Sequence, residues 1–146
     1  MNSSPVAQTL ASLLLIAISI NVAATASQYK VATVSESTLR EWAITIVLPT
    51  FPEESKKDNS QGVAVAQVTI DEAGAVTRAE ILEAPDDAIA EAVKAGTMKW
   101  TFQPGTDDRD GKAVRLKGKL TFYYVIENGK AFVKHPKQFA RTGRTP

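Results

Sequence analysis

The sequence predicts an α+β domain in which a helix covers one face of an antiparallel sheet. Three features indicate this fold: an alternating apolar hairpin over residues 62–82, a helical apolar stripe over residues 89–100, and a long alternating strand over residues 113–126. An isolated hairpin is marginally stable in water, so one of its faces needs cover from the rest of the chain. The 146 residues, of which 44% are hydrophobic and 23% are charged, are typical of one globular domain.

The N-terminus has the pattern of an export signal. Residues 10–26 carry no charged side chain and end in the small-x-small sequence Ala24-Thr25-Ala26. As a helix these residues would span about 25 Å, which is less than the ~30 Å hydrocarbon core of a bilayer. We therefore expect residues 1–26 to be a signal peptide cleaved after Ala26; the alternative is an uncleaved membrane anchor.

Residues 27–48 are predicted to form an N-terminal extension. Ser35 or Ser37 could cap a short helix, and residues 43–48 could form a strand; the pattern does not decide between these two structures. Because apolar side chains usually lie inside, we expect the extension to pack Trp42 onto the domain.

The predicted domain, residues 49–133, begins with a short helix. Pro52 stands at a first-turn position, and two acidic residues follow it, where the helix dipole favours negative charge. This helix should end near residues 58–60, so that the hairpin begins at Gly62.

The hairpin is predicted from a period of two. Gly74 lies in the polar break over residues 71–74, where a tight connection often needs positive φ. A second apolar limb follows over residues 76–82. The residues of the first limb that are predicted to share one face are Ala64, Ala66, Val68 and Ile70.

The next segment predicts the helix that covers the hairpin. Asp86 or Asp87 can cap its start, and Pro104 blocks its continuation. Gly96 is costly in a helix interior, so we expect the helix to approach the sheet closely at this residue. Trp100 and Phe102 are predicted to lie in the core. The apolar stripe at helical spacing comprises Ile89, Ala92, Val93, Gly96 and Trp100.

The polar loop over residues 105–112 is predicted to be a solvated turn. Its acidic residues raise the question of a calcium site, but the ligand spacing of an EF-hand is absent and no glutamate closes the loop. Asp110-Gly111 is the dipeptide that we expect to set the bend.

The last long strand, residues 113–126, is predicted to have one core face and one polar face. We expect it to lie at a sheet edge, where its free backbone donors and acceptors can pair with another chain. Asn128-Gly129 favours a type I′ turn, after which residues 131–133 could fold back as a fourth strand and block this edge. Residues 134–146 are predicted to be a basic flexible tail. The predicted core face holds Val114, Leu116, Leu120, Phe122, Tyr124 and Ile126, and the other face holds Arg115, Lys117, Lys119, Thr121, Tyr123 and Val125.

Three motifs together resemble the C-terminal domain of TonB-family energy transducers. They read PTFPEES, GVAVAQVTIDEAGAVTRAEIL and AIAEAVKAGTMKWTFQPGTDDRDGKAV. In that family the run is a Pro-aromatic-Pro-Glu helix start, a Gly-led strand ending in Thr-Ile-Asp, a helix closing on Trp-x-Phe-x-Pro, and an Asp-Gly-Lys turn into the last strand. The resemblance covers residues 48–126. It implies an α+β fold with two helices packed on one side of a three- to four-stranded antiparallel sheet, in the order α-β-β-α-β(-β).

The resemblance also implies a function in the periplasm. Members of this family bind a short N-terminal box of an outer-membrane transporter by strand addition, and so couple inner-membrane energy to uptake. Members that transmit force hold a histidine in an N-terminal helix, whereas residues 10–26 contain none. The alternatives are a membrane-anchored energy transducer and an exported scaffold or assembly domain without a transport role, which could form a homodimer by edge pairing. The partner-binding residues that the resemblance implies are Phe51, Pro52, Arg115, Lys117, Lys119, Thr121 and Tyr123.

Other function classes have little support in the sequence. The formal net charge of +1 argues against a nucleic-acid binder, and the absence of cysteine excludes disulfides and cysteine metal sites. The one histidine, His135, stands before Pro136, where nothing would orient it as a general base. No phosphate loop or cofactor motif is present. We therefore expect no enzymatic activity, no metal and no cofactor.

Overall fold

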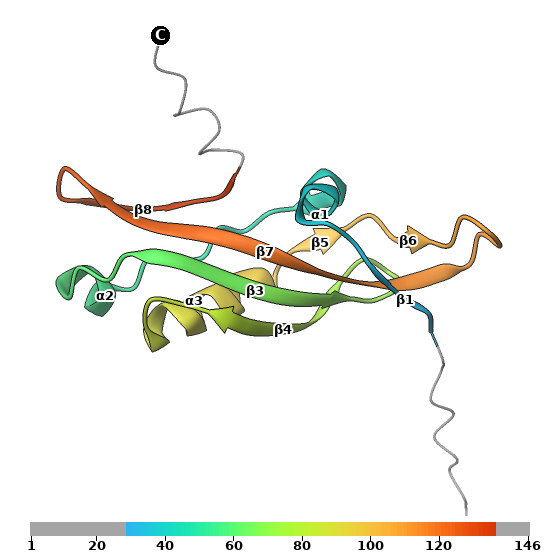
Figure 1. The fold of residues 1–146 in the computed structure, drawn as a ribbon, viewed down its shortest axis with the longest axis horizontal. Coiled ribbons are helices and arrows are strands. Elements are labelled where there is room, and N and C mark those ends of the chain that lie inside the picture. Colours follow the sequence, from blue (N-terminus) through green and yellow to red (C-terminus); the bar gives the residue numbers. More distant parts are fainter. Residues whose placement is uncertain (1–28, 137–146) are drawn as a thin grey trace, which may run out of the picture.

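A computed structural model of the chain describes residues 29–136 (Figure 1). The expected signal peptide and residues 137–146 of the expected tail lie outside this part of the chain. The predicted α+β class is confirmed. The elements in chain order are β1 (Val31–Thr33), α1 (Glu36–Trp42), β2 (Ala43–Thr45), α2 (Glu53–Lys57), β3 (Gly62–Ile70), β4 (Val76–Glu83), α3 (Asp87–Thr97), β5 (Thr101–Phe102), β6 (Gly105–Thr106), β7 (Ala113–Glu127) and β8 (Lys130–Lys134).

The main sheet has the strand order β1-β7-β3-β4, and β6 and β8 also pair with β7. β1 runs parallel to β7, whereas the other pairs in this sheet are antiparallel. The sheet is therefore mixed rather than antiparallel throughout, because the N-terminal extension adds a parallel strand of three residues. A second, two-stranded sheet pairs β2 with β5.

The long strand β7 lies inside the main sheet, so the expectation that it would be a free edge is wrong. It pairs with β3 along one side and with β1 and β8 along the other. Alternation along a strand fixes which side chains share a face, but it does not fix which strands lie at either edge. The predicted return strand is confirmed as β8, and the turn before it holds Asn128 and Gly129 at φ values of 52° and 73°.

The core lies against one face of the main sheet. The four residues predicted to share a face of β3 are fully buried, and α3 packs over β3 and β4 with Ile89 and Val93 inside. Trp100 and Phe102 are buried as predicted, with ring centroids 6.0 Å apart. The Trp100 Nε1–H donates to the Val47 carbonyl at 2.8 Å, so this buried donor has a partner.

The extension before the domain contains both of the structures that the sequence left open. α1 begins after Ser35, whose hydroxyl accepts a hydrogen bond from the Thr38 N–H at 3.2 Å, and β2 follows directly. Leu39 is fully buried, and Trp42 packs against the core. Residues 29–48 therefore share the core of the domain that follows them.

α3 begins at the cap that the sequence predicted. The Asp86 carboxylate accepts a hydrogen bond from the Ile89 N–H at 2.7 Å. Burial raises the pKa of Asp86, but hydrogen bonds from the Ile89 N–H and from Ser60 outweigh it and hold the pKa below its usual value.

Two glycines mark close approaches of the backbone. Gly74 has φ +90°, and a Cβ at this residue would lie 1.9 Å from the Phe102 carbonyl oxygen. A Cβ at Gly96 would lie 3.0 Å from the Cα of Pro49. The predicted close approach of α3 is thus to the segment before α2 and not to the sheet, because that segment crosses the helix.

Candidate functional site

The outer edge of β7, on the side away from β3, is covered at both ends by other strands. At one end β1 lies beside residues 115–117, where the Arg115 N–H donates to the Lys30 carbonyl at 3.0 Å and the Val34 N–H donates to the Lys117 carbonyl at 2.9 Å. At the other end β8 pairs with residues 123–127. Among the described strands, none pairs with residues 118–122 on this side.

Side chains of α1 cover the middle of this edge. One oxygen of the Glu36 carboxylate accepts from the Thr121 N–H at 2.7 Å, and the other accepts from the Thr121 hydroxyl at 2.8 Å. The Arg40 guanidinium donates to the Thr121 carbonyl at 2.7 Å and to Glu36 at 2.6 Å. An acceptor and a donor from α1 therefore occupy the positions that the backbone of a neighbouring strand would occupy. We call these contacts of Glu36 and Arg40 with Thr121 the α1 clasp.

Arg40 is held in a mostly buried position by this arrangement. Its side chain is 4% exposed, and its Cζ lies 5.8 Å from the ring centroids of both Trp100 and Phe122. A buried guanidinium is costly without a counter-charge, and Glu36 supplies one. Arg40 therefore takes part in an ion pair with Glu36, contacts two aromatic rings, and contributes its hydrogen bond with Thr121 to the α1 clasp.

A pocket of about 490 Å³ opens beside the α1 clasp. It is bounded by residues 33–36 on one side and residues 117–119 on the other, together with Gln67 and Thr121. Lys117 and Lys119 are exposed, and neither pairs with an acidic side chain among the described residues. Every second residue of a strand points its backbone N–H and C=O to the same side. Because those of Lys117 and Thr121 form hydrogen bonds on the outer side of β7, the N–H and C=O of Lys119 also point outward, into this gap in the edge.

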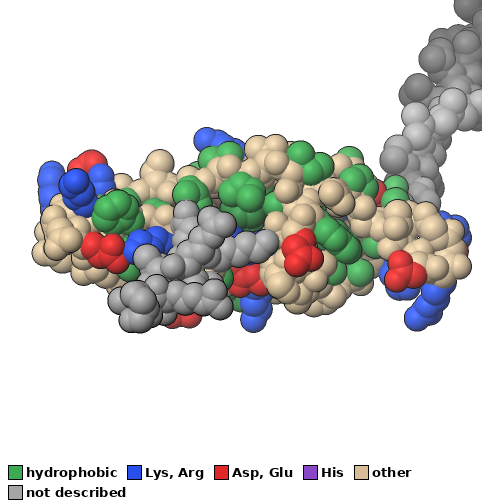
Figure 2. All heavy atoms as spheres, turned by 90° about the horizontal axis from the view of Figure 1, so that it is seen from above, with side chains coloured by type: hydrophobic (Ala, Val, Ile, Leu, Met, Phe, Trp, Pro, Cys, Tyr) green, Lys and Arg blue, Asp and Glu red, His purple; other side chains and the backbone are tan. Residues whose placement is uncertain are grey.

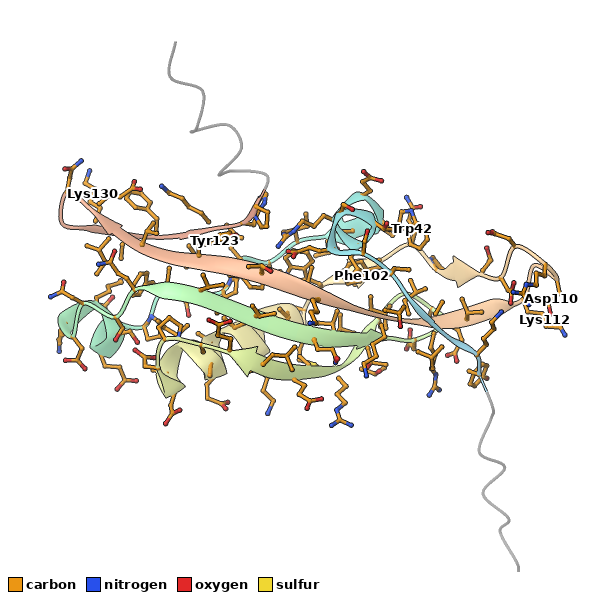
Figure 3. The ribbon with its side chains drawn as sticks, viewed as in Figure 1. Trp42, Phe102, Asp110, Lys112, Tyr123 and Lys130 are labelled. Carbon is orange, nitrogen blue, oxygen red and sulfur yellow. The ribbon has the colours of Figure 1, made fainter. Side chains whose placement is uncertain are left out.

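The residues implied as partner-binding fall on two sides of the sheet. Tyr124 points into the core, so its neighbours at odd positions of β7 point to the opposite, helix-free face. Figure 3 shows Tyr123 on the half of β7 that runs beside β8, and Asp110 and Lys112 near the turn before the strand. The five members of the set that share the helix-free face are Arg115, Lys117, Lys119, Thr121 and Tyr123.

Phe51 lies on the core side instead, and Pro52 stands at the N-cap of α2. The Phe51 ring meets the Tyr124 ring edge to face at 5.1 Å, and the Tyr124 hydroxyl donates to the Thr50 carbonyl at 3.2 Å. Burial, with a smaller contribution from the negative charge of Asp86, raises the pKa of Tyr124 far above its ordinary value. Phe51 therefore packs against the core at the start of α2.

Arg115 has partners of its own. Its Nε donates to Glu72 at 2.8 Å, and its Cζ lies 4.8 Å from the Tyr29 ring centroid. It is therefore less available to a partner than Lys117 and Lys119.

Glu36 and Arg40 are the contributors to this edge that the sequence did not single out. Their i, i+4 spacing behind a serine cap is visible in the sequence and predicts an ion pair on a helix face. The position of that face against Thr121, 85 residues later, is set only by the tertiary fold.

The side of the molecule that carries α1 and β8 also has an apolar component. Figure 2 views this side from above and shows a discontinuous band of apolar side chains along its length, with charged side chains at both ends and along its borders. Exposed apolar residues of the described chain include Ile44, Ile46 and Leu48 around β2 and Phe132 on β8.

No helix within residues 29–136 is both long enough and apolar enough to cross a membrane. Within the same range, no group of three or more histidine, cysteine, aspartate or glutamate side chains is arranged to hold a metal ion.

Comparison with known proteins assigns the family. A family model described as the Gram-negative bacterial TonB protein C-terminal matches residues 47–126. A solution NMR structure of the TonB C-terminal domain of Pseudomonas aeruginosa aligns with a TM-score of 0.49 and 22% identity, covering 59% of this chain and 86% of that one. No curated protein matches the sequence. Because the family model spans more than half of the chain, the chain belongs to the TonB C-terminal domain family, whose members are energy-transducer domains and not enzymes.

Proposed function

We propose that this domain acts in the periplasm in energy-coupled transport, by binding a TonB-box-like segment of an outer-membrane transporter as an added strand on β7. Membership of the family implies energy transduction to outer-membrane transporters. The observation that carries the specific mode is the gap in the outer edge of β7 at residues 118–122, which lacks a strand partner among the described residues.

An incoming strand can bind at this edge only by displacing the side chains of α1 that cover it. The gap of about five residues is ~17 Å long, which is the length of an ordinary strand. Thr121 at its centre is already satisfied by the α1 clasp, so an incoming strand must displace Glu36 and Arg40. The flanking covers are short, because β1 has three residues and β8 has five.

The partner-binding residues then have different roles. Lys117 and Lys119 border the gap, and neither has an acidic partner within residues 29–136, while Thr121 offers its backbone N–H and C=O once the α1 clasp opens. Tyr123 adds an aromatic side chain on the same face. Phe51 and Pro52 act indirectly in this proposal, because Phe51 supports Tyr124 behind the strand.

Alternate amide methylation of the partner tests the binding mode. A fluorescent TonB-box peptide is titrated against the full chain, next to two versions in which every second backbone amide is N-methylated in opposite phases. Strand addition predicts that one phase weakens binding at least tenfold and the other changes it little, because only one set of amides faces β7. Equal binding of both phases, or no binding of the unmodified peptide, refutes the proposal.

Assembly through β2 is a second candidate. β2 pairs only with β5 among the described strands; Ile44 in β2 is 66% exposed and Ile46, which follows it, is 50% exposed. An exposed apolar edge favours pairing with another chain. Sedimentation velocity of the full chain and of an Ile44→Lys, Ile46→Lys variant tests this: a dimer that the variant abolishes supports assembly, and a monomeric wild-type chain refutes it.

The periplasmic location and the domain boundaries are part of the proposal. Residues 1–26 are taken as a cleaved signal, residues 27–48 as the extension, residues 49–133 as the family domain, and residues 134–146 as a basic tail. N-terminal sequencing of the protein recovered from cells tests the first of these: a start at Ser27 supports cleavage, and an intact Met1 in membrane fractions favours an anchored transducer.

A further inference from the structure

We infer that β4 is a second pairing edge of this domain, and that its partner is β4 of a second copy of this chain, related by a two-fold axis that passes between the two Ala79 residues. The inference does not rest on strand addition at β7. In the sheet order β1-β7-β3-β4, β4 lies at the border away from β1 and β8, so its pairing leaves the outer edge of β7 unchanged (Figure 1).

The direction of the backbone groups in β4 follows from the strands beside it. On β7 the odd-numbered residues Arg115, Lys117 and Thr121 use their backbone groups on the outer side. The even-numbered residues of β7 therefore point theirs toward β3, where they lie opposite even-numbered residues of β3. This pairing leaves the odd-numbered residues of β3 with their backbone groups directed at β4.

The outer side of β4 consequently carries backbone groups without a strand partner. Gln67 of β3 lies opposite Glu80, so the N–H and C=O of Glu80 point toward β3 and those of its neighbours Ala79 and Ile81 point outward. Within residues 29–136, no strand pairs with this side of β4 and no hydrogen bond reaches the outward groups of Ala79 or Ile81. Such an edge is a template for pairing with another strand.

Two opposite charges stand on the helix-free face of this edge. The side chains of Arg78 and Glu80 are 73% and 54% exposed, and they contact each other at 3.5 Å. Neither forms another ion pair with a described residue. Both charges are therefore accessible to a strand that pairs with β4.

These charges select one register for two antiparallel copies of β4. With Ala79 opposite the partner's Ala79, Arg78 lies opposite the partner's Glu80, and Glu80 lies opposite the partner's Arg78. A shift of two residues in one direction places Glu80 opposite Glu80, and in the other direction Arg78 opposite Arg78; like charges directly opposite are destabilising. A shift of one residue places outward backbone groups opposite inward ones. The edge is therefore self-complementary about Ala79.

α3 borders the same edge with a mixed surface. A groove of about 580 Å³ between β4 and α3 is lined by residues of both elements, among them the exposed Glu91, Lys94 and Met98 of α3 and its C-cap. The two-fold axis places both copies of α3 on the same face of the joined sheet. Because the side chains along the groove include both signs of charge and an apolar residue, no like-charged surface opposes the pairing.

Charge reversal in the full chain tests this register. Sedimentation velocity is measured up to about 1 mM protein, because one pair of strands buries less surface than a standard interface and binds weakly. The variants are Arg78→Glu, Glu80→Arg and the double exchange of both residues. Lys57→Glu and Asp108→Arg are the controls, which reverse exposed charges on other parts of the domain.

We expect the wild-type chain to dimerise and each single reversal to weaken the dimer about tenfold or more, because the two-fold axis makes one substitution change two cross-strand pairs. The double exchange should restore the dimer, since every opposite pair is then attractive again. An equimolar mixture of Arg78→Glu and Glu80→Arg should form a heterodimer, because one chain then carries two acids and the other two bases. Both controls should behave as wild type.

Hydrogen exchange gives a second readout that does not depend on a variant. The amides of Ala79 and Ile81 should gain protection as the concentration of the wild-type chain rises, because pairing gives them acceptors. Unchanged exchange of these two amides across a dimerisation transition overturns the inference.

The remaining outcomes are equally decisive. The inference is overturned by a wild-type chain that stays monomeric, by a dimer that the single reversals leave intact, or by a mixture that does not assemble. A dimer lost only in Ile44→Lys, Ile46→Lys belongs to β2 and overturns it as well. The titration with N-methylated peptides decides strand addition at β7 separately, whichever way the dimer experiment falls.

Discussion

Replacement of Gly118 by alanine should detach the N-terminal segment from β7 while leaving the rest of the fold intact. Gly118 lies on the core-facing side of β7, directly under α1. A Cβ at this residue would lie 2.5 Å from Leu39 Cδ1 and 2.9 Å from the Val34 carbonyl oxygen. The Leu39 methyl can move by a rotamer change, but the Val34 oxygen is backbone and moves only with the whole segment.

The size of the effect follows from the two contacts. Overpacking a filled site by one methyl group costs about 1 to 3 kcal/mol. Because the atoms nearest to the added methyl belong to residues 34 and 39, we expect this cost to fall on the docking of the segment 31–42 against β7. A loss of 1 to 3 kcal/mol corresponds to a factor of about 5 to 150 in the docking equilibrium. The three atoms nearest to the added methyl belong to Leu39 and Val34, and none of them belongs to β3, β4 or α3.

Hydrogen exchange followed by mass spectrometry measures this directly. Amides of residues 31–42 in Gly118→Ala should exchange about 5 to 150 times faster than in the wild type, and those of β3 and α3 should keep their protection. Lys119→Ala is the matched control, since it truncates an exposed side chain on the adjacent residue. Unchanged exchange of residues 31–42, or an equal loss of protection across the whole chain, refutes the account of α1 as a separable cover.

Three further substitutions test the fold. Gly74→Ala should cost about 3 kcal/mol in urea denaturation, because the residue has φ +90° and its methyl would lie 1.9 Å from a backbone oxygen; Gly111→Ala, with φ +67° and open space around it, should cost only about 1 kcal/mol, and equal costs would contradict the steric argument. Trp100→Phe should cost about 2 to 4 kcal/mol by chemical denaturation, because it leaves the Val47 carbonyl without its donor and a void in the core; a loss under about 1 kcal/mol would argue against the hydrogen bond. The pKa of Asp86 is lowered in the folded state, so its stabilising contribution is present above its unfolded pKa of about 3.9 and is lost as pH falls through the lower folded value. The stability difference between the wild type and Asp86→Asn, measured by urea denaturation at several pH values, should therefore shrink below about pH 4, and a difference independent of pH would contradict this.

Most features of the fold could be predicted from local patterns in the sequence. The burial of alternate residues in β3, the cap of α3 and the positive φ of Gly74 each depend on a few neighbouring residues, so the sequence was sufficient to predict them. The close approach at Gly96 was predicted from its cost in a helix, but its partner Pro49 was not, because that contact joins segments far apart in the chain.

The candidate site depends mostly on contacts between segments that are far apart in the chain. The faces of β7 follow from its alternation, and the position of Lys117 and Lys119 on the helix-free face was predictable. The neighbours of β7 were not predictable, because β1 and β8 are short strands whose pairing is decided by the tertiary fold. For the same reason Glu36 was visible only as half of a helical ion pair.

A strand that binds partners by its edge must be covered in the unbound protein, and its cover must be easy to displace; the α1 clasp meets both requirements. An open edge invites aggregation, and natural proteins cover it, yet a long covering strand would be hard to displace. In the gap between β1 and β8 the outward backbone groups belong to Lys119 and Thr121, and the clasp satisfies only those of Thr121. A partner strand satisfies both residues, and two additional hydrogen bonds contribute about 1 to 3 kcal/mol. This gain opposes the entropy lost in ordering the partner and the burial of Leu39 and Arg40 that is lost when α1 leaves, so exchange should be sensitive to small changes in α1. Affinity for a TonB-box peptide should accordingly respond more to substitutions at Glu36 and Gly118 than to truncation of the exposed lysines; the opposite ranking would mean that side-chain charge, and not competition for the β7 backbone, controls binding.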